Sequence, residues 1–266
     1  MTAKKKMNVL DKIVSRKIEE VAEAKQKVSV AELALSESFS LKPLVFKDFL
    51  LDENRTGIIA EFKRRSPSKG LINGVVTVEE VTQAYSMAGA SALSVLTDKD
   101  FFGGEPIDLL KARAVNQIPI LRKDFIIDEY QILEAKSWGA DIILLIASIL
   151  TPMQIADFGK LAQSLGLNVL LEVHDLAELE RSVCPHLNAI GVNNRNLGDF
   201  TVNIQTSFDL ADKIPNDFLK ISESAIDNPT VIKELRAVGY NGFLIGENFM
   251  KTPNPGSAIK EFVSQL

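Results

Sequence analysis

One pattern repeats eight times along the chain after residue 55. In each repeat, a short run rich in Ile, Val and Leu is followed by a polar turn and then by an amphipathic stretch. Strands that are apolar along their whole length are typical of a parallel sheet with helices on both faces. Eight such strands alternating with helices close most simply into a ring, so we predict an α/β fold, the (β/α)8 TIM barrel. The runs are Ile58–Lys63, Ala92–Leu96, Pro119–Phe125, Ile142–Ile146, Asn168–Val173, Ala189–Asn194, Phe218–Ser224 and Phe243–Gly246.

The ends of the predicted helices carry capping signals that support this repeat. The starts are Thr77 with Glu80, Asp128 with Gln131, Asp175 with Glu178, Thr151 with Pro152, and Asn228 with Pro229. The ends are marked by Gly89, Gly139, Gly166 and Gly239, as expected for C-cap glycines. An open doubly wound sheet is the alternative, but no G-x-G-x-x-G motif follows the first strand.

The first 50 residues lie outside the repeat. Here apolar residues follow the i, i+3, i+4 spacing of an amphipathic helix; they are Leu10, Ile13, Val14, Ile18 and Val21. We expect this helix to cover one end of the barrel, and a part in closing the pocket is the second possibility. The prediction is one domain over residues 1–266, with an N-terminal helical extension at 1–50 and the barrel at 56–266.

Charge and composition exclude several classes of protein. The net charge is −5, and the only short basic block, Lys4 to Lys6, is expected to be a solvated tail, so no nucleic-acid partner is predicted. The single cysteine, Cys184, excludes an intrachain disulfide and suits a reducing cytosol. The N-terminus lacks the apolar stretch of a signal peptide, and the run Ile142–Leu150 is far short of the roughly 20 residues of a membrane helix. We expect a cytoplasmic monomer with no membrane partner.

Charged and polar residues gather at the carboxyl ends of the predicted strands, where barrel enzymes place their active sites. Because side chains alternate along a strand, Glu61 shares a face with Lys63, and Asn193 shares a face with Arg195. If these faces point inward, the candidate side chains converge on one pocket. The candidates from the first, third, fifth and sixth strands are Glu61, Lys63, Lys123, Glu172, Asn193 and Arg195.

The seventh strand is less simple. Glu223 has the opposite parity to Ser222 and Ser224, so its entry into the pocket requires a bend at the strand end.

The alternative for the charged residues is a set of buried ion pairs that only support the barrel. Their common position at strand ends favours a functional site, because carboxylates and ammoniums in a dry pocket perturb one another's pKa. A lysine that transfers protons near neutral pH is expected to have its pKa lowered from about 10.4.

A phosphate site is predicted at the loops after the seventh and eighth strands, which often bind phosphate in such barrels. These segments hold Ser224, Ala225, Gly246 and Glu247, and Ser66 in the first loop can donate to the same oxygens. The two histidines have no metal-ligand spacing, so no metal is predicted, and His174 is expected to be a hydrogen-bonded loop residue.

Five segments together resemble the indole-3-glycerol phosphate synthase family, and the resemblance covers nearly the whole chain. The segments Ala60–Ser68 and Leu121–Gln131 are highly specific, and all occur in the family's order on the expected strands. The others are Leu171–His174, Gly191–Leu197 and Ser222–Ser224.

The resemblance implies conversion of 1-(2-carboxyphenylamino)-1-deoxyribulose 5-phosphate to indole-3-glycerol phosphate in tryptophan biosynthesis, with release of carbon dioxide and water. It implies a small phosphorylated substrate, and no cofactor or metal. Lys123 matches the general acid of ring closure, and Glu172 an acidic group that acts in dehydration. Lys63 matches a lysine near the substrate carboxylate and phosphate, while Glu61 and Asn193 match residues that orient these groups.

The resemblance also implies the binding residues. Arg195 lines the carboxylate side, and Phe102 and Phe125 pack on the anthranilate ring. The segments that contain Ser66, Glu223, Ser224, Ala225, Gly246 and Glu247 contact the remaining substrate groups. Two positions depart from the family: Ala225 replaces a common Gly, and Asn248 replaces a small residue, so the phosphate contacts depend on the backbone there.

Other functions remain open at this point. A phosphoribosylanthranilate isomerase does not need two inward lysines, and a Schiff-base aldolase is trapped by borohydride. A catalytically inactive barrel that serves as a scaffold is expected to have lost some of the convergent charges.

Overall fold

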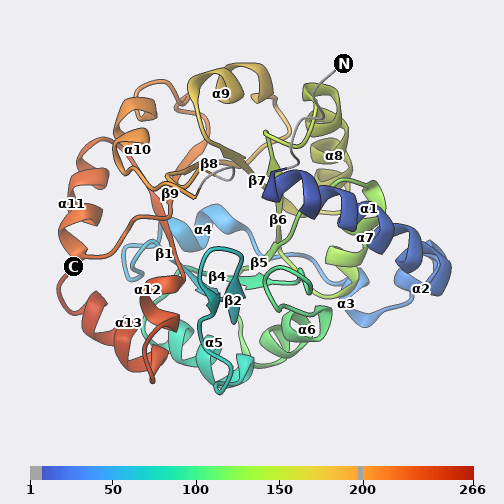
Figure 1. Ribbon diagram of the computed structural model, residues 1–266, viewed down its shortest axis with the longest axis horizontal. Coiled ribbons are helices and arrows are strands. Elements are labelled where there is room, and N and C mark those ends of the chain that lie inside the picture. Colours follow the sequence, from blue (N-terminus) through green and yellow to red (C-terminus); the bar gives the residue numbers. More distant parts are fainter. Residues whose placement is uncertain (1–7, 197–199) are drawn as a thin grey trace, which may run out of the picture.

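Eight parallel strands close into a barrel in the computed structural model, which describes residues 8–196 and 200–266. The ring order is β1-β10-β9-β8-β7-β6-β5-β4, and helices surround it (Figure 1). The predicted (β/α)8 barrel is therefore confirmed, with differences only at the strand ends. The strands are β1 (Ile58–Phe62), β4 (Ala92–Leu96), β5 (Ile120–Lys123), β6 (Ile142–Ile146), β7 (Asn168–Val173), β8 (Ala189–Asn193), β9 (Leu219–Glu223) and β10 (Gly242–Ile245).

The outer helices begin where the capping signals predict. Capping boxes form at Thr77, Asp128 and Thr151. The box predicted at Asp175 is wrong in part: Asp175 accepts from the backbone N of Glu178, but the Glu178 carboxylate instead accepts from the backbone N of His174. The helices are α5 (Val78–Met87), α6 (Pro106–Val115), α7 (Glu129–Ser137), α8 (Pro152–Ser164), α9 (Leu176–Ser182), α10 (Gln205–Leu210), α11 (Pro229–Ala237), α12 (Glu247–Met250) and α13 (Pro255–Val263).

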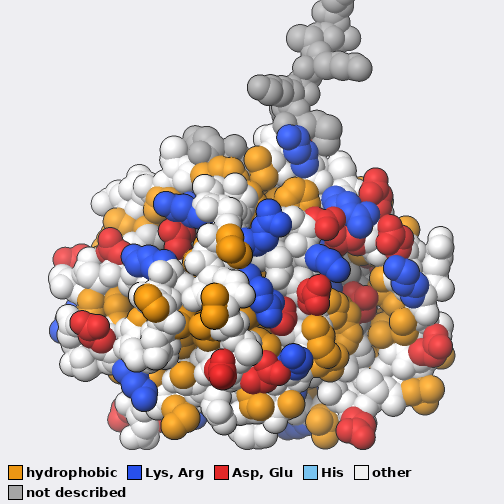
Figure 2. Space-filling view, turned by 60° about the horizontal axis from the view of Figure 1, so that its bottom comes forward, with side chains coloured by type: hydrophobic (Ala, Val, Ile, Leu, Met, Phe, Trp, Pro, Cys, Tyr) orange, Lys and Arg blue, Asp and Glu red, His pale blue; other side chains and the backbone are white. Residues whose placement is uncertain are grey.

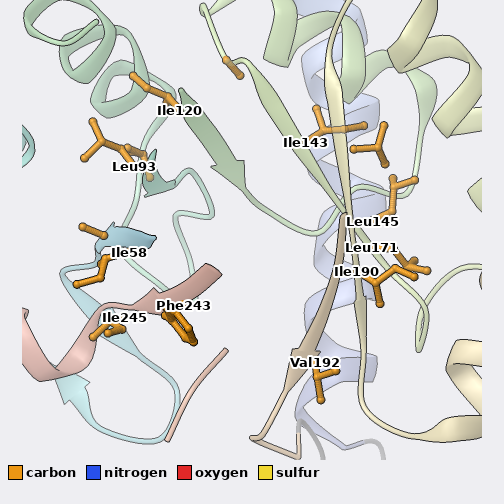
Figure 3. Close-up of a cluster of buried hydrophobic side chains, with 14 of the residues drawn as sticks. Ile58, Leu93, Ile120, Ile143, Leu145, Leu171, Ile190, Val192, Phe243 and Ile245 are labelled. Carbon is orange, nitrogen blue, oxygen red and sulfur yellow. The ribbon is translucent and has the colours of Figure 1, made fainter. Parts of the chain in front are cut away.

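Each strand is apolar on both sides because it separates two cores. Residues such as Ile58, Leu93 and Ile143 face the surrounding helices (Figure 3). Their neighbours of opposite parity, among them Ile59 and Leu144, fill the inside of the barrel. Full burial of each such side chain contributes about 1.5–3 kcal/mol, so both faces favour the closed ring.

The N-terminal extension forms α1 (Val9–Lys27), α2 (Val30–Leu33), α3 (Glu37–Ser40) and α4 (Phe46–Leu50). Ile13 and Val21 are buried as predicted, but Ile18 is 58% exposed, so its place in the apolar stripe was wrong. The buried position between Ile13 and Val21 belongs instead to Lys17, which is 3% exposed. A helix turn brings i and i+4 together, and a lysine can occupy that line when acidic partners neutralise it.

The extension reaches both ends of the barrel rather than the single end that was expected. Phe46 and Leu50 of α4 pack with the residues that fill the barrel, and Leu50 lies against Gly242, the first residue of β10. At the carboxyl end, Lys17 of α1 pairs with Asp98 and Asp124, which follow β4 and β5. The extension therefore packs against the amino end of the barrel and stabilises the loops at its carboxyl end.

The surface carries charges of both signs, as the similar numbers of basic and acidic residues in the sequence indicate (Figure 2). Basic and acidic side chains are interspersed among the described residues on the face drawn in Figure 2. None of the helices within residues 8–196 and 200–266 combines the length and apolar character that a membrane crossing requires. The basic block Lys4 to Lys6 lies outside the described residues.

Candidate active site

The carboxyl ends of the strands surround a cavity with about 770 Å³ of empty space. Most of the residues predicted from the sequence line it. They are Glu61, Lys63, Ser66, Phe102, Lys123, Phe125, Glu172, Asn193, Arg195, Glu223, Ser224 and Glu247. The remaining two, Ala225 and Gly246, line a hollow that adjoins this cavity and shares several of its residues.

Lys123 stands at the centre of the charged groups. From the end of β5, its Nζ donates to Glu172 Oε2 at 2.7 Å and to Glu223 Oε2 at 3.1 Å. Both carboxylate side chains are 2% exposed, whereas the lysine side chain is 15% exposed and reaches the cavity. Two buried carboxylates thus fix the position of one accessible ammonium, which restricts its rotamers and presents its remaining N–H to a ligand.

A second lysine–carboxylate pair comes from β1. Lys63 Nζ lies 3.1 Å from Glu61 Oε1, and Ser94 Oγ of β4 donates to Glu61 Oε2 at 3.1 Å. The carboxylate lies so close to Gly246 that a Cβ there would stand 2.7 Å from Oε1. A glycine at this strand end therefore leaves the room that Glu61 needs.

The pKa of Lys123 is raised, not lowered as expected from the sequence. Burial by itself lowers it, but the negative charges of Glu172, Glu223 and Glu61 outweigh burial. The pKa of Glu172 is lowered: burial opposes this, and Lys123 and His174 prevail. In Glu223 burial prevails over Lys123, and with the repulsion of Glu172 it raises the pKa to about 7. The site thus holds a cationic lysine beside a carboxyl group that titrates near neutral pH.

Glu223 enters the pocket directly, so the predicted bend is not needed. It shares its inward face with Ile221, whereas Ser222 points outward and its Oγ lies 2.8 Å from Ser207 Oγ. Ser224 lines the cavity only because the chain leaves the strand there with a φ of 65°.

The adjoining hollow has the features expected of an anion site. It has about 670 Å³ of empty space, and Ser224, Ala225, Gly246 and Glu247 line it. Three basic side chains, Lys63, Arg195 and Lys251, also line it, together with the carboxylates of Glu61 and Asp227. Ala225 has a φ of 60°, so the backbone adopts the left-handed conformation that a glycine would adopt freely. An alanine adopts this conformation at a cost of about 1–2 kcal/mol.

Two phenylalanines form an aromatic wall beside Lys123. The rings of Phe102 and Phe125 lie 5.9 Å apart between centroids. The loop of Phe102 is held by Asp98, whose Oδ1 accepts from the backbone N of Phe101 and of Phe102. A planar aromatic ligand can pack on this wall while its polar substituents reach the charged groups.

Comparison with known proteins decides the family. Residues 10–262 match the model of the family described as indole-3-glycerol phosphate synthase. An indole-3-glycerol phosphate synthase of Bacteroides thetaiotaomicron is 46% identical over 268 residues, covering 97% of this chain and 99% of the relative. The chain belongs to the indole-3-glycerol phosphate synthase family. A second member, from an Acidovorax species, is 42% identical and covers 96% of this chain and 98% of its own.

Two solved structures at 12% and 14% sequence identity share the fold of this chain. One is the N-acetylmannosamine-6-phosphate 2-epimerase of Clostridium perfringens, with a TM-score of 0.58 and 14% identity. It covers 82% of this chain and 96% of its own.

Some residues around the site of this family member were not predicted from its sequence. Lys17 lies 2.9 Å from Asp98 Oδ2 and 3.0 Å from Asp124 Oδ1, and so joins the two loops that carry the aromatic wall. The sequence did offer one sign that Asp98 and Asp124 belong to the site, because each closely follows a strand. Nothing in helical periodicity shows that a lysine of α1 pairs with them. Among the described residues no His, Cys, Asp or Glu side chains gather into a group of three that could hold a metal ion.

Proposed function

We propose that this pocket carries out the family's reaction through Lys123, held between Glu172 and Glu223. As a member of its family the protein is a carboxy-lyase, an indole-3-glycerol phosphate synthase of tryptophan biosynthesis. The observation that carries the residue assignment is the fixed ammonium beside both an aromatic wall and an anion hollow. The substrate has an aromatic ring at one end and a phosphate at the other, so its shape fits this arrangement.

In ring closure, the aromatic carbon that bears the carboxylate attacks the ketone carbon. Negative charge develops on the ketone oxygen, and Lys123 gives it a proton. A positioned general acid of this kind contributes about 10²–10⁴-fold. The raised pKa suits the role, because it keeps the donor protonated until a strongly basic oxygen forms.

Decarboxylation follows, and restores the aromatic ring. Phe102 and Phe125 hold the ring, while Lys63 and Arg195, which also line the cavity, bind the carboxylate. The apolar wall favours loss of charge as carbon dioxide, because a carboxylate is poorly solvated there.

Dehydration then needs an acid for the departing hydroxide and a base for a carbon-bound proton. Glu172 takes part in this step together with Lys123, to which it is hydrogen-bonded. Glu61 and Asn193 orient the substrate hydroxyls and the neighbouring lysine. The pKa of Glu223 is raised to about 7, so this carboxylate can take up a proton when the anionic ligand binds.

The phosphate binds in the adjoining hollow. Ser224 donates its hydroxyl to the phosphate there, and the backbone at Ala225, Gly246 and Glu247 lines the hollow. Ser66 donates its hydroxyl to the phosphate from the main cavity.

The experiment is direct turnover. Purified protein is incubated with the carboxyphenylamino-deoxyribulose phosphate and a metal chelator, and indole fluorescence is followed. Lys123→Ala should lower turnover at least about 100-fold with substrate binding largely kept. Lys160→Ala, on the exposed side of α8, is the matched control and should match the wild type. Near-wild-type turnover of Lys123→Ala would remove the lysine from its assigned role.

A Schiff-base mechanism is disfavoured by the charges around Lys123. A nucleophilic amine must be neutral, and three carboxylates keep this one protonated. Borohydride with substrate should therefore leave no covalent adduct in the mass spectrum.

We also propose that the protein acts as a cytoplasmic monomer without a nucleic-acid partner. Sedimentation at the concentration used in the assay tests this.

A further inference from the structure

The proposed reaction consumes one proton in each turnover. The substrate enters as a carboxylate and leaves carbon dioxide and water, so charge balance requires a proton from solvent. While the ligand is bound, two protons are given, to the ketone oxygen and to the departing hydroxide, and one is taken back from carbon. Lys123 can give the first, so it must be recharged inside an occupied pocket.

Glu172 connects Lys123 to a histidine outside the cavity. Its Oε2 accepts from Lys123, and its Oε1 lies 3.5 Å from Nε2 of His174, just beyond the end of β7. This nitrogen is buried and has no hydrogen-bond partner within the described part of the chain. An unpartnered ring nitrogen thus faces the free oxygen of the proposed catalytic carboxylate.

The second ring nitrogen of His174, Nδ1, is connected to the protein surface through Glu178 and Arg181. His174 Nδ1 lies 3.1 Å from Glu178 Oε2 on α9, which confirms the expected hydrogen-bonded histidine. Glu178 Oε1 lies 3.8 Å from Arg181, whose side chain is 44% exposed. Burial lowers the pKa of His174, but the Glu178 hydrogen bond and the charges of Glu172, Glu178 and Glu223 outweigh it and raise the pKa. The ring therefore bridges an inner and an outer carboxylate and favours its cationic form.

We propose that His174 is a positioning residue for Glu172 that also supplies it with the proton used in dehydration. This inference rests on the proposed function. After Lys123 has protonated the ketone oxygen, the Nε2–H bond of the imidazolium breaks and its proton passes to Glu172 Oε1. Glu172 passes a proton to the neutral amine of Lys123, which is then ready to protonate the departing hydroxide. The proton removed from carbon passes to the amine of Lys123, which is thereby cationic again. The ring of His174 is left neutral, with its proton on Nδ1 facing Glu178, and regains one proton from solvent when the product leaves.

The test uses His174→Gln, because the amide keeps a hydrogen-bond donor but has no proton to transfer at neutral pH. His186→Gln is the matched control, since this second histidine is hydrogen-bonded to Gln163 at an exposed position. Single-turnover rates are measured from pH 6 to 9 with the full-length enzyme in excess, so product release does not hide the chemical steps. At pH 7 His174→Gln should be at least about tenfold slower with unchanged substrate affinity. Added imidazole should restore part of the rate, and His186→Gln should match the wild type.

Two results would overturn the inference. One is a His174→Gln rate within twofold of wild type at every pH. The other is a slower rate that keeps the wild-type pH profile and does not respond to imidazole, which would show a structural role alone. Absence of turnover in the wild type and in His186→Gln would instead refute the proposed function.

A second measurement does not depend on folding of the His174 variant. In His186→Gln, His174 is the only histidine of the sequence, so its titration can be followed by NMR. Adding Glu172→Gln should move the midpoint to lower pH, because it removes a negative charge that raises the pKa. An unchanged midpoint would show that the two side chains are not coupled and would also overturn the inference.

Discussion

Gly191 on β8 provides a sharp test of the site's geometry, because the Glu223 carboxylate occupies the space where a side chain would be. A Cβ at residue 191 would stand 2.2 Å from Glu223 Oε1 and 3.3 Å from a methyl carbon of Leu170. Ordinary contact begins at 3.4 Å, so Oε1 must move by about 1 Å. The other oxygen of the same carboxylate, Oε2, accepts a hydrogen bond from Lys123 Nζ at 3.1 Å, and a carboxylate shift of this size breaks that hydrogen bond.

A displacement of about 1 Å in an active site can lower the rate about 100-fold, which corresponds to about 2.7 kcal/mol in the activation free energy. Gly191→Ala should therefore lower kcat/KM by about 100-fold, measured from initial rates of indole fluorescence. The fold should remain, because the displaced group is the far end of a flexible side chain. Gly74→Ala is the control, since a Cβ there meets only the Leu71 side chain, at 3.4 Å, and activity should stay at the wild-type level.

A double-mutant cycle shows whether the lower rate of Gly191→Ala comes from the collision with Glu223 or from a general loss of structure. Glu223→Ala removes the carboxylate with which the new methyl group collides. The double variant Gly191→Ala, Glu223→Ala should therefore be no slower than Glu223→Ala alone, within about twofold. Wild-type activity in Gly191→Ala, or full additivity of the two losses, would refute the reasoning.

Three further outcomes are expected. Lys17→Met should lower the free energy of unfolding by about 3–5 kcal/mol, because it leaves two buried aspartates without their ammonium. Lys25→Met, which removes an exposed pair on the same helix, should cost less than about 1 kcal/mol; equal losses in urea titrations would contradict this. Ala225→Gly should raise the free energy of unfolding by about 0.5–1 kcal/mol by relieving a left-handed φ, and a lower melting temperature would count against it. Glu223 has its pKa raised from 4.5 to about 7 on folding, so its proton stabilises the wild type below pH 4.5 and this contribution is lost as pH rises through 7. The stability of the wild type relative to Glu223→Gln should accordingly fall between pH 5 and 8, and a constant difference would be inconsistent with the raised pKa.

The strands and most helix starts could be predicted because their causes are local. Apolar runs such as Ile142–Ile146 must be buried on both faces, and a cap such as Thr77 acts on backbone groups within one turn. The candidate pocket could be assembled for the same reason. Alternation along a strand places Glu61 with Lys63 whatever the rest of the chain does, and barrel closure brings strand ends together.

Alternation along a strand shows which residues share a face. Whether that face points into the barrel depends on what packs against it. The sequence showed that Ser222 and Glu223 face opposite ways, but not which of them faces inward. That was decided by Ser207 on α10, which holds Ser222 outside, and by Gly191 on β8, which leaves space for Glu223 inside. Both partners are distant along the chain.

The chain's sequence by itself determined the eightfold alternation, the helix caps and which residue types stand at the strand ends, because these follow from burial and hydrogen bonding within a few residues. Only the tertiary structure decided that Lys17 is buried between Asp98 and Asp124, and that Lys123 has a raised rather than a lowered pKa. The physical reason is that electrostatic energy and burial depend on distances between groups from different strands and helices. Those distances exist only once the barrel has closed.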